Sequence, residues 1–83
     1  MKPLAYPNPF RQETTVEFTI PVAAQTSLAL TDEYGKVLRE ETKLREAGRQ
    51  QIMINAENLP EGIYYYKIRI NNEIKTIRLM KTR

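Results

Sequence analysis

Apolar and polar residues alternate along most of this sequence. In residues 14–21 the apolar side chains of Val16, Phe18 and Ile20 occupy every second position, with threonine or glutamate between them. Side chains of a β-strand point alternately to its two faces, so this pattern predicts a strand with one buried and one exposed face. Similar runs follow Pro9 at the spacing expected of an all-β sandwich or barrel: residues 14–21, 26–31, 36–44, 49–56, 63–70 and 73–82.

The run over residues 63–70 contains three consecutive tyrosines and predicts a long central strand. Its alternation places four side chains on one face, which we expect to be the core face: Tyr64, Tyr66, Ile68 and Ile70. The pair Asn71-Asn72 follows directly. Because asparagine tolerates the left-handed conformation of a tight hairpin, residues 73–82 are predicted to return antiparallel to the tyrosine strand.

Turn signals separate the other predicted strands. Asp32 can accept hydrogen bonds from nearby backbone amides and Gly35 can adopt a positive φ, so they predict a hairpin turn into residues 36–44. Gly48 and the Pro-Glu-Gly sequence ending at Gly62 indicate two further loops. The charged residues 36–44 suggest a solvated or edge strand, although the propensity of residues 37–48 also allows a short helix.

The Tyr-Pro-Asn-Pro-Phe motif that starts at Tyr6 cannot form a central strand, because its two prolines lack the amide hydrogen that a sheet requires. We expect it to lie along a sheet edge, with Tyr6 and Phe10 packed inward. No linker or low-complexity segment interrupts the chain. Residues 1–83 are therefore predicted to form a single domain, with residues 1–5 as a poorly ordered leader.

The composition argues against an enzyme. The 83 residues include no cysteine and no histidine, so thiolate nucleophiles, cysteine-based zinc sites and the usual neutral-pH general base are missing. Ser27 is the single serine, and no histidine can activate it. The carboxylates show neither an apolar-flanked pair nor the spacing of an EF-hand loop. We therefore expect a domain without catalytic residues, metal site or cofactor.

Positive charge gathers at the C-terminal end. The net charge is +3, and no acidic residue follows Glu73, whereas four basic residues do: Lys75, Arg78, Lys81 and Arg83. One interpretation is that these cations prevent the last strand from pairing with another chain. Another is that the strand presents them to an acidic receptor surface. The two interpretations do not exclude each other, and a dimer through an edge strand also stays open.

Tyr65, Lys67 and Arg69 share the face opposite to the predicted core face. Such residues can form a stacking platform for single-stranded nucleic acid or sugars. A platform of this kind uses several exposed rings, however, and the alternation leaves one tyrosine here. We therefore expect the tyrosines to be structural and the domain to have no nucleic-acid partner.

Several motifs occur in a characteristic order. They are Tyr-Pro-Asn-Pro-Phe, Thr-Thr-Val-Glu-Phe-Thr-Ile-Pro, Leu-Ala-Leu-Thr-Asp-Glu-Tyr-Gly-Lys-Val-Leu, a segment from Ala47 to Ile68 that contains Leu-Pro-Glu-Gly-Ile-Tyr, and a basic terminal strand. This ordered set resembles the type A C-terminal sorting domain of the type IX secretion system, and the resemblance covers residues 6–83. It implies an immunoglobulin-like β-sandwich of about seven antiparallel strands.

The resemblance also implies a function. Domains of this family are not enzymes and follow a large N-terminal cargo. They direct that cargo from the periplasm through an outer-membrane translocon to the cell surface, where a sortase commonly removes them. The residues that match the family's recurring turn, strand and basic terminal positions are Gly35, Gly48, Gly62, Tyr64, Lys75, Arg78, Lys81 and Arg83. We expect Gly62, Tyr64 and the four basic residues to carry the signal.

Two features depart from the family pattern, and alternatives stay open. Thr31 stands where an aromatic residue is frequent, and Met1 lies close to the first motif, so we expect this chain to be an excised or released part of a longer protein. The immunoglobulin-like domain of flagellar hook-capping proteins shares some of the motifs but has a longer connection before the tyrosine strand. A structural accessory domain of that kind, or a carbohydrate-binding module, is the alternative function.

Overall fold

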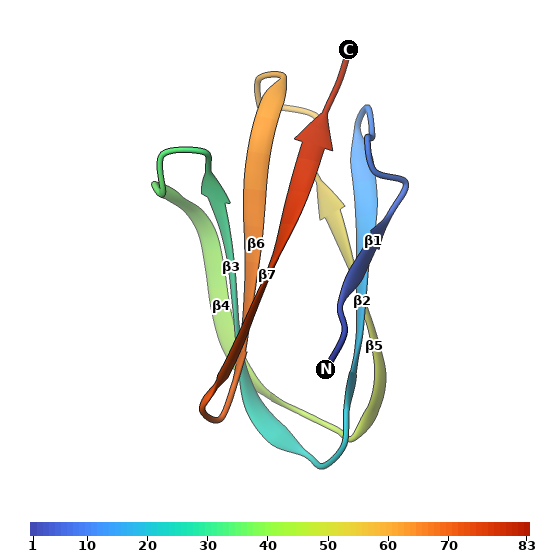
Figure 1. Ribbon diagram of the computed structural model, residues 1–83, viewed down its shortest axis with the longest axis vertical. Coiled ribbons are helices and arrows are strands. Elements are labelled where there is room, and N and C mark those ends of the chain that lie inside the picture. The colour runs from blue at the N-terminus through green and yellow to red at the C-terminus, as the bar shows by residue number, and fades with distance from the viewer.

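The computed structural model describes residues 1–83 and consists of β-strands joined by turns. The strands are β1 (Leu4–Tyr6), β2 (Glu13–Ile20), β3 (Ala24–Asp32), β4 (Val37–Arg45), β5 (Gly48–Asn55), β6 (Gly62–Ile70) and β7 (Glu73–Lys81). They form a three-stranded sheet in the order β1-β2-β5 and a four-stranded sheet in the order β4-β3-β6-β7, in which all neighbours are antiparallel (Figure 1). No helix has the length and apolar character to cross a membrane.

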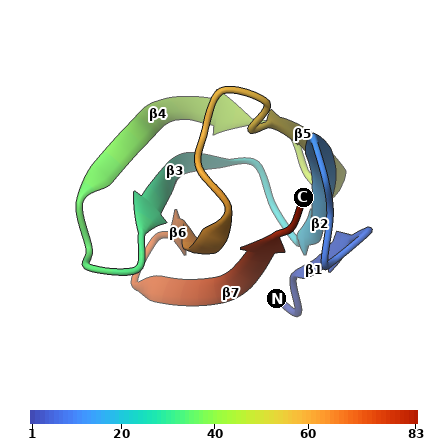
Figure 2. The same ribbon diagram turned by 90° about the horizontal axis from the view of Figure 1, so that it is seen from above.

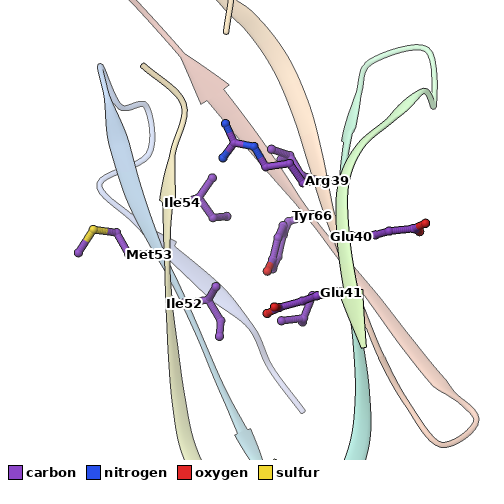
Figure 3. Close-up of a pocket in the computed structure, with 9 residues that line it drawn as sticks. Arg39, Glu40, Glu41, Ile52, Met53, Ile54 and Tyr66 are labelled. Atoms are coloured by element: carbon purple, nitrogen blue, oxygen red, sulfur yellow. The ribbon is translucent and has the colours of Figure 1, made fainter. Parts of the chain in front are cut away.

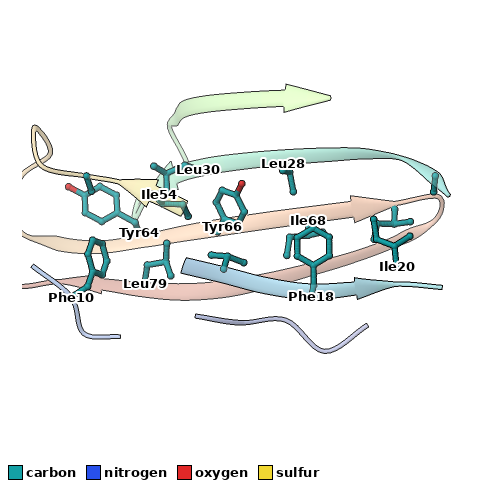
Figure 4. Close-up of a cluster of buried hydrophobic side chains, with 14 residues drawn as sticks. Phe10, Phe18, Ile20, Leu28, Leu30, Ile54, Tyr64, Tyr66, Ile68 and Leu79 are labelled. Carbon is teal, nitrogen blue, oxygen red and sulfur yellow. The ribbon is translucent and has the colours of Figure 1, made fainter. Parts of the chain in front are cut away.

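The core lies between the two sheets. Every second residue of β2, β3 and β6 points into it, as the alternation predicts, and Phe18, Leu30 and Ile68 are almost completely buried (Figure 4). The tyrosine strand β6 is central in its sheet, and its predicted core face is confirmed. The all-β fold with seven antiparallel strands in two sheets is thus confirmed, and the immunoglobulin-like character stays a prediction.

The charged segment after Gly35 forms the edge strand β4. It pairs with β3 on one side and with no strand on the other, as its charged residues suggest. The alternative of a short helix is wrong. The segment pairs with β3 over nearly its whole length, and these long-range backbone hydrogen bonds outweigh a weak local helical propensity.

Two of the predicted turns show why their residue types are needed. The Asp32 Oδ1 atom accepts hydrogen bonds from the backbone N–H groups of Tyr34 and Lys36, both at 2.9 Å, and Gly35 has a φ of 91°. At the β6–β7 hairpin, Asn71 adopts a φ of 55°, in the left-handed region that asparagine tolerates. Both hairpin predictions are confirmed.

The first motif lies along an edge, and one of its two aromatic residues differs from the prediction. Phe10 is 3% exposed and belongs to the core, but the expectation that Tyr6 packs inward is wrong. Tyr6 pairs with Thr15 on the face of β2 that also carries Glu17, and that face points to solvent. Its hydroxyl donates a 2.6 Å hydrogen bond to the Glu17 carboxylate. This hydrogen bond and the neighbouring Arg49 lower the pKa of the Glu17 carboxyl.

The N-terminal segment, predicted as a poorly ordered leader, is placed against the sandwich. Leu4 and Ala5 belong to β1, and Met1 packs against the core. The Met1 amino group lies 3.9 Å from Glu73 at the start of β7. The first strand and the last strand therefore lie side by side along one side of the molecule (Figure 2).

Candidate functional site

The terminal strand β7 carries three of the six predicted signal residues and is held along its full length by β6. The pairing runs in register from Gly62 opposite Lys81 to Ile70 opposite Glu73. Leu79 anchors the strand because its side chain is completely buried between the sheets, close to Phe10 and Tyr64 (Figure 4). The basic strand is therefore part of the folded sandwich and has one defined register.

Asn8 clamps the other edge of β7. Its side-chain Nδ2 donates to the carbonyl of Arg78 at 2.8 Å, and its Oδ1 accepts from the backbone N–H of Met80 at 2.9 Å. One amide side chain thus offers β7 the donor and acceptor that a neighbouring strand would offer. Since the adjacent prolines lack N–H groups, the side chain supplies the pairing that this part of the backbone cannot supply in full.

Phe10 extends this pairing toward the C-terminus. Its backbone N–H donates to the carbonyl of Met80 at 3.0 Å, and its carbonyl accepts from the N–H of Thr82 at 2.8 Å. Phe10 and Lys81 form a parallel bridge between these segments. The Tyr-Pro-Asn-Pro-Phe motif therefore connects the end of β7 to the three-stranded sheet, whose strand β2 follows the motif in sequence.

The last basic residues contact the turn before β6. Lys81 Nζ donates to the carbonyl of Leu59 at 2.6 Å. Arg83 lies 3.7 Å from the Glu61 carboxylate, but its side chain is 92% exposed, so this ion pair contributes little stability. The terminal strand and the Pro-Glu-Gly turn consequently form one end of the molecule.

Tyr64 closes the same turn from within. Its hydroxyl donates a hydrogen bond to the carbonyl of Pro60, four residues earlier, and its ring is buried in the core. A tyrosine at the start of a strand that bonds backward in this way resembles the tyrosine corner described for immunoglobulin-like sandwiches. Burial raises the pKa of Tyr64, and the charge of Asp32 raises it further, so the hydroxyl stays protonated and can donate.

The structure brings together some of the predicted signal residues and separates others. The group that gathers at the end of the molecule, which we name the terminal cluster, is Gly62, Tyr64, Lys81 and Arg83. Lys75 and Arg78 lie further along β7 and are both exposed. By strand alternation Lys75 shares the face of the buried Leu79, whereas Arg78 lies opposite Tyr65 on the outer face. The basic residues therefore do not form one continuous patch.

The remaining predicted positions are turn residues distant from β7 in sequence. Asp32 and Gly35 shape the β3–β4 turn, and Gly48, with a φ of 117°, begins β5. The role of Asn8 was not predicted from the sequence, although its position between two prolines, where it has the one hydrogen-bonding side chain, was a usable signal. Its partner on β7, however, is set by the three-dimensional fold.

Comparison with known proteins assigns the family. A family model described as the secretion system C-terminal sorting domain matches residues 4–82, from the first residue of β1 to beyond the end of β7. No curated protein matches the chain significantly. The match confirms the resemblance drawn from the ordered motifs and favours it over the hook-capping alternative. The chain therefore belongs to the C-terminal sorting domains of the type IX secretion system.

Proposed function

We propose that this domain is a non-catalytic address that an outer-membrane translocon and a cell-surface sortase recognise on a secreted cargo. The observation that carries the proposal is the family match over residues 4–82. In this role the domain follows its cargo in one polypeptide, crosses the periplasm with it and reaches the cell surface or the exterior. It needs no cofactor, metal or nucleic acid.

The recognised feature is the folded terminal strand with the terminal cluster at its end. Pairing with β6 and the Asn8 clamp keep the backbone of β7 in one register, so its exposed cations stand at fixed spacings. Lys75 and Arg78 are exposed and form no ion pair. They lie on opposite faces of the edge strand β7, so an acidic receptor surface meets both of them when it contacts this edge, and its charge would steer the encounter.

The test is export of a fluorescent protein fused before this domain, in a bacterium that has the type IX system. We expect Lys75→Glu with Arg78→Glu to leave the reporter in the periplasm, because the reversed charges repel an acidic receptor. Adding Lys81→Glu extends the reversal to the terminal cluster. Reporter fluorescence in the medium, at the surface and in the periplasm is the measurement.

A matched control reverses two exposed cations on the opposite side of the same sheet, Lys36 in the turn before β4 and Lys43 in the edge strand β4. This variant has the same net charge and should be exported normally. Thermal unfolding of each purified domain shows whether a loss of export follows from a loss of folding. Normal export of a folded variant with glutamate at positions 75 and 78 would show that the basic strand has a structural role alone.

A further inference from the structure

The sandwich is open on the side opposite to the β1–β7 contact. There β4 is the edge of one sheet and β5 the edge of the other, and they do not pair although only Glu46 and Ala47 connect them. A cavity of about 200 Å³ lies between them. Figure 3 shows Ile52 and Ile54 of β5 entering this space from one side, Glu41 from the other, and Tyr66 between them.

The free edge of β5 has unpaired backbone groups that face this opening. The Ala56 N–H donates to the carbonyl of Gln12 at 2.8 Å, which continues the β2–β5 ladder. In β5 the backbone N–H and C=O groups of the even-numbered residues are therefore those that bond to β2. The N–H and C=O groups of the odd-numbered residues therefore point away from β2. Arg39 of β4 donates to the Asn55 carbonyl at 2.6 Å, while Gln51 and Met53 have no backbone partner there.

The other three edges have features that discourage strand addition. The edge of β1 has three residues between Pro3 and Pro7, and the C-terminal half of β7 is occupied by Asn8 and Phe10. Along β4 the inward positions carry charged side chains. The strand β5 contains one charged residue, Arg49, and no proline. After Arg49 its side chains are apolar or amides. The edge of β5 is thus the least protected of the four.

Charge on the inward face of β4, part of which forms one wall of the cavity, restricts what can enter. Four side chains of β4 share its inward face, opposite buried residues of β3: Arg39, Glu41, Lys43 and Arg45. Arg39 and Glu41, together with Glu40, line the cavity, whereas Lys43 and Arg45 continue the inward face beyond it. Three of the four inward side chains are cations, so the inward face of β4 as a whole is positive. Arg45 contacts Glu41 at 3.1 Å, but its Nε atom is buried without a partner. A buried donor of this kind is stabilised by an additional acceptor, and a carboxylate is the strongest one.

We propose that the free edge of β5 accepts an extended strand from another polypeptide, with apolar side chains at alternate positions and a carboxylate among them. Its backbone pairs with Gln51 and Met53, and its apolar side chains enter the cavity beside Ile52 and Ile54. Its carboxylate meets the cations that continue the inward face of β4 beyond the cavity, Lys43 and Arg45. The added strand closes the opening between the two sheets. This site is separate from β7 and does not depend on the proposed sorting function.

The probe is the synthetic peptide acetyl-Thr-Val-Thr-Val-Thr-Glu-Thr-amide with a fluorescent label, titrated with the purified domain and followed by fluorescence anisotropy. Met53→Pro removes a free-edge N–H without removing a bond to β2. We expect it to weaken binding by on the order of tenfold, the effect of losing roughly 1.4 kcal/mol of pairing. Met53→Ala keeps the N–H and loses the same exposed side chain, so it should weaken binding less than Met53→Pro does.

Two modified peptides test the pairing on the unchanged domain, so that a folding defect cannot explain the result. In one peptide the backbone nitrogens of the valines and the glutamate are methylated, and in the other those of the threonines. Alternate N–H groups of a strand point to the same edge, so only one of these sets can face β5. One peptide should therefore lose binding while the other retains it. A peptide with lysine in place of glutamate should bind about tenfold more weakly. Equal binding of the two methylated forms, or no binding of the parent peptide at millimolar concentration, would overturn the proposal.

A second copy of this chain is the competing occupant. Sedimentation over a range of concentrations detects a dimer, and Met53→Pro would abolish a dimer formed through β5. Such a dimer without peptide binding would overturn the proposal of a foreign strand. Peptide binding to a domain that sediments as a monomer supports it.

Discussion

Replacing Asn8 with alanine should loosen the terminal strand and leave the rest of the sandwich folded. The side chain makes two hydrogen bonds, to the Arg78 carbonyl and to the Met80 amide, at 2.8 and 2.9 Å. Each such bond contributes about 0.5 to 1.5 kcal/mol net, and because Asn8 is exposed we expect a total loss of about 1 to 2 kcal/mol. For a small domain with total stability of roughly 5 to 10 kcal/mol this is a measurable fraction.

Two measurements check the Asn8 prediction. Urea unfolding should show a lower midpoint with an unchanged m-value, since the native and unfolded states keep their compactness. Amide exchange should accelerate at Met80, whose N–H loses its acceptor, and far less at Ile68 in the central strand. Asn8→Asp keeps the acceptor and loses the donor, so its loss should be smaller at Met80. A stability loss below about 0.3 kcal/mol with unchanged exchange at Met80 would refute the clamp.

Three further predictions concern the core, a turn and pH. Leu79→Ala should cost about 2 to 5 kcal/mol because Leu79 is completely buried, whereas Leu44→Ala, at a side chain 68% exposed, should change stability by less than about 0.5 kcal/mol in urea unfolding. Gly35→Ala should cost about 1 kcal/mol in the same assay, because a φ of 91° strains a residue with a Cβ atom although no neighbour blocks it; an unchanged midpoint would contradict this. Burial raises the pKa of Tyr66 from 10.0 to about 12, with a smaller contribution from Glu41, so the unfolded chain releases this proton first. Stability should therefore fall as pH rises from about 10 to about 12, and thermal unfolding of Tyr66→Phe should show a shallower fall than Tyr34→Phe, whose ring is 88% exposed.

Alternation was sufficient to predict most of the fold. In β2 and β6 every second residue is apolar, and burial of one face leaves a single consistent orientation for each strand. The hairpin at Asn71 was predictable as well, because a local conformation requires that residue type. These features depend on neighbours in sequence, which is why the sequence sufficed to identify them.

The features that the sequence did not reveal depend on distant contacts. Tyr6 points outward because its opposite residue Thr15 lies on the solvent face of β2, and nothing within the first motif specifies that pairing. The terminal cluster likewise results from the pairing of Gly62 with Lys81, which places a turn beside the last residues. The open side between β4 and β5 was unforeseen because two strands joined by two residues ordinarily form a hairpin, and here they belong to different sheets.

The contact of Asn8 with Met80 joins positions 72 residues apart in a chain of 83. Closing so large a loop is entropically costly before other contacts reward it, and contacts of this separation slow folding. During synthesis the ribosome releases residue 80 long after residue 8. The clamp can therefore form only when translation of this segment is finished. A prematurely terminated polypeptide would carry a loose tail, and a machine that reads the clamped strand would thereby pass over incomplete products.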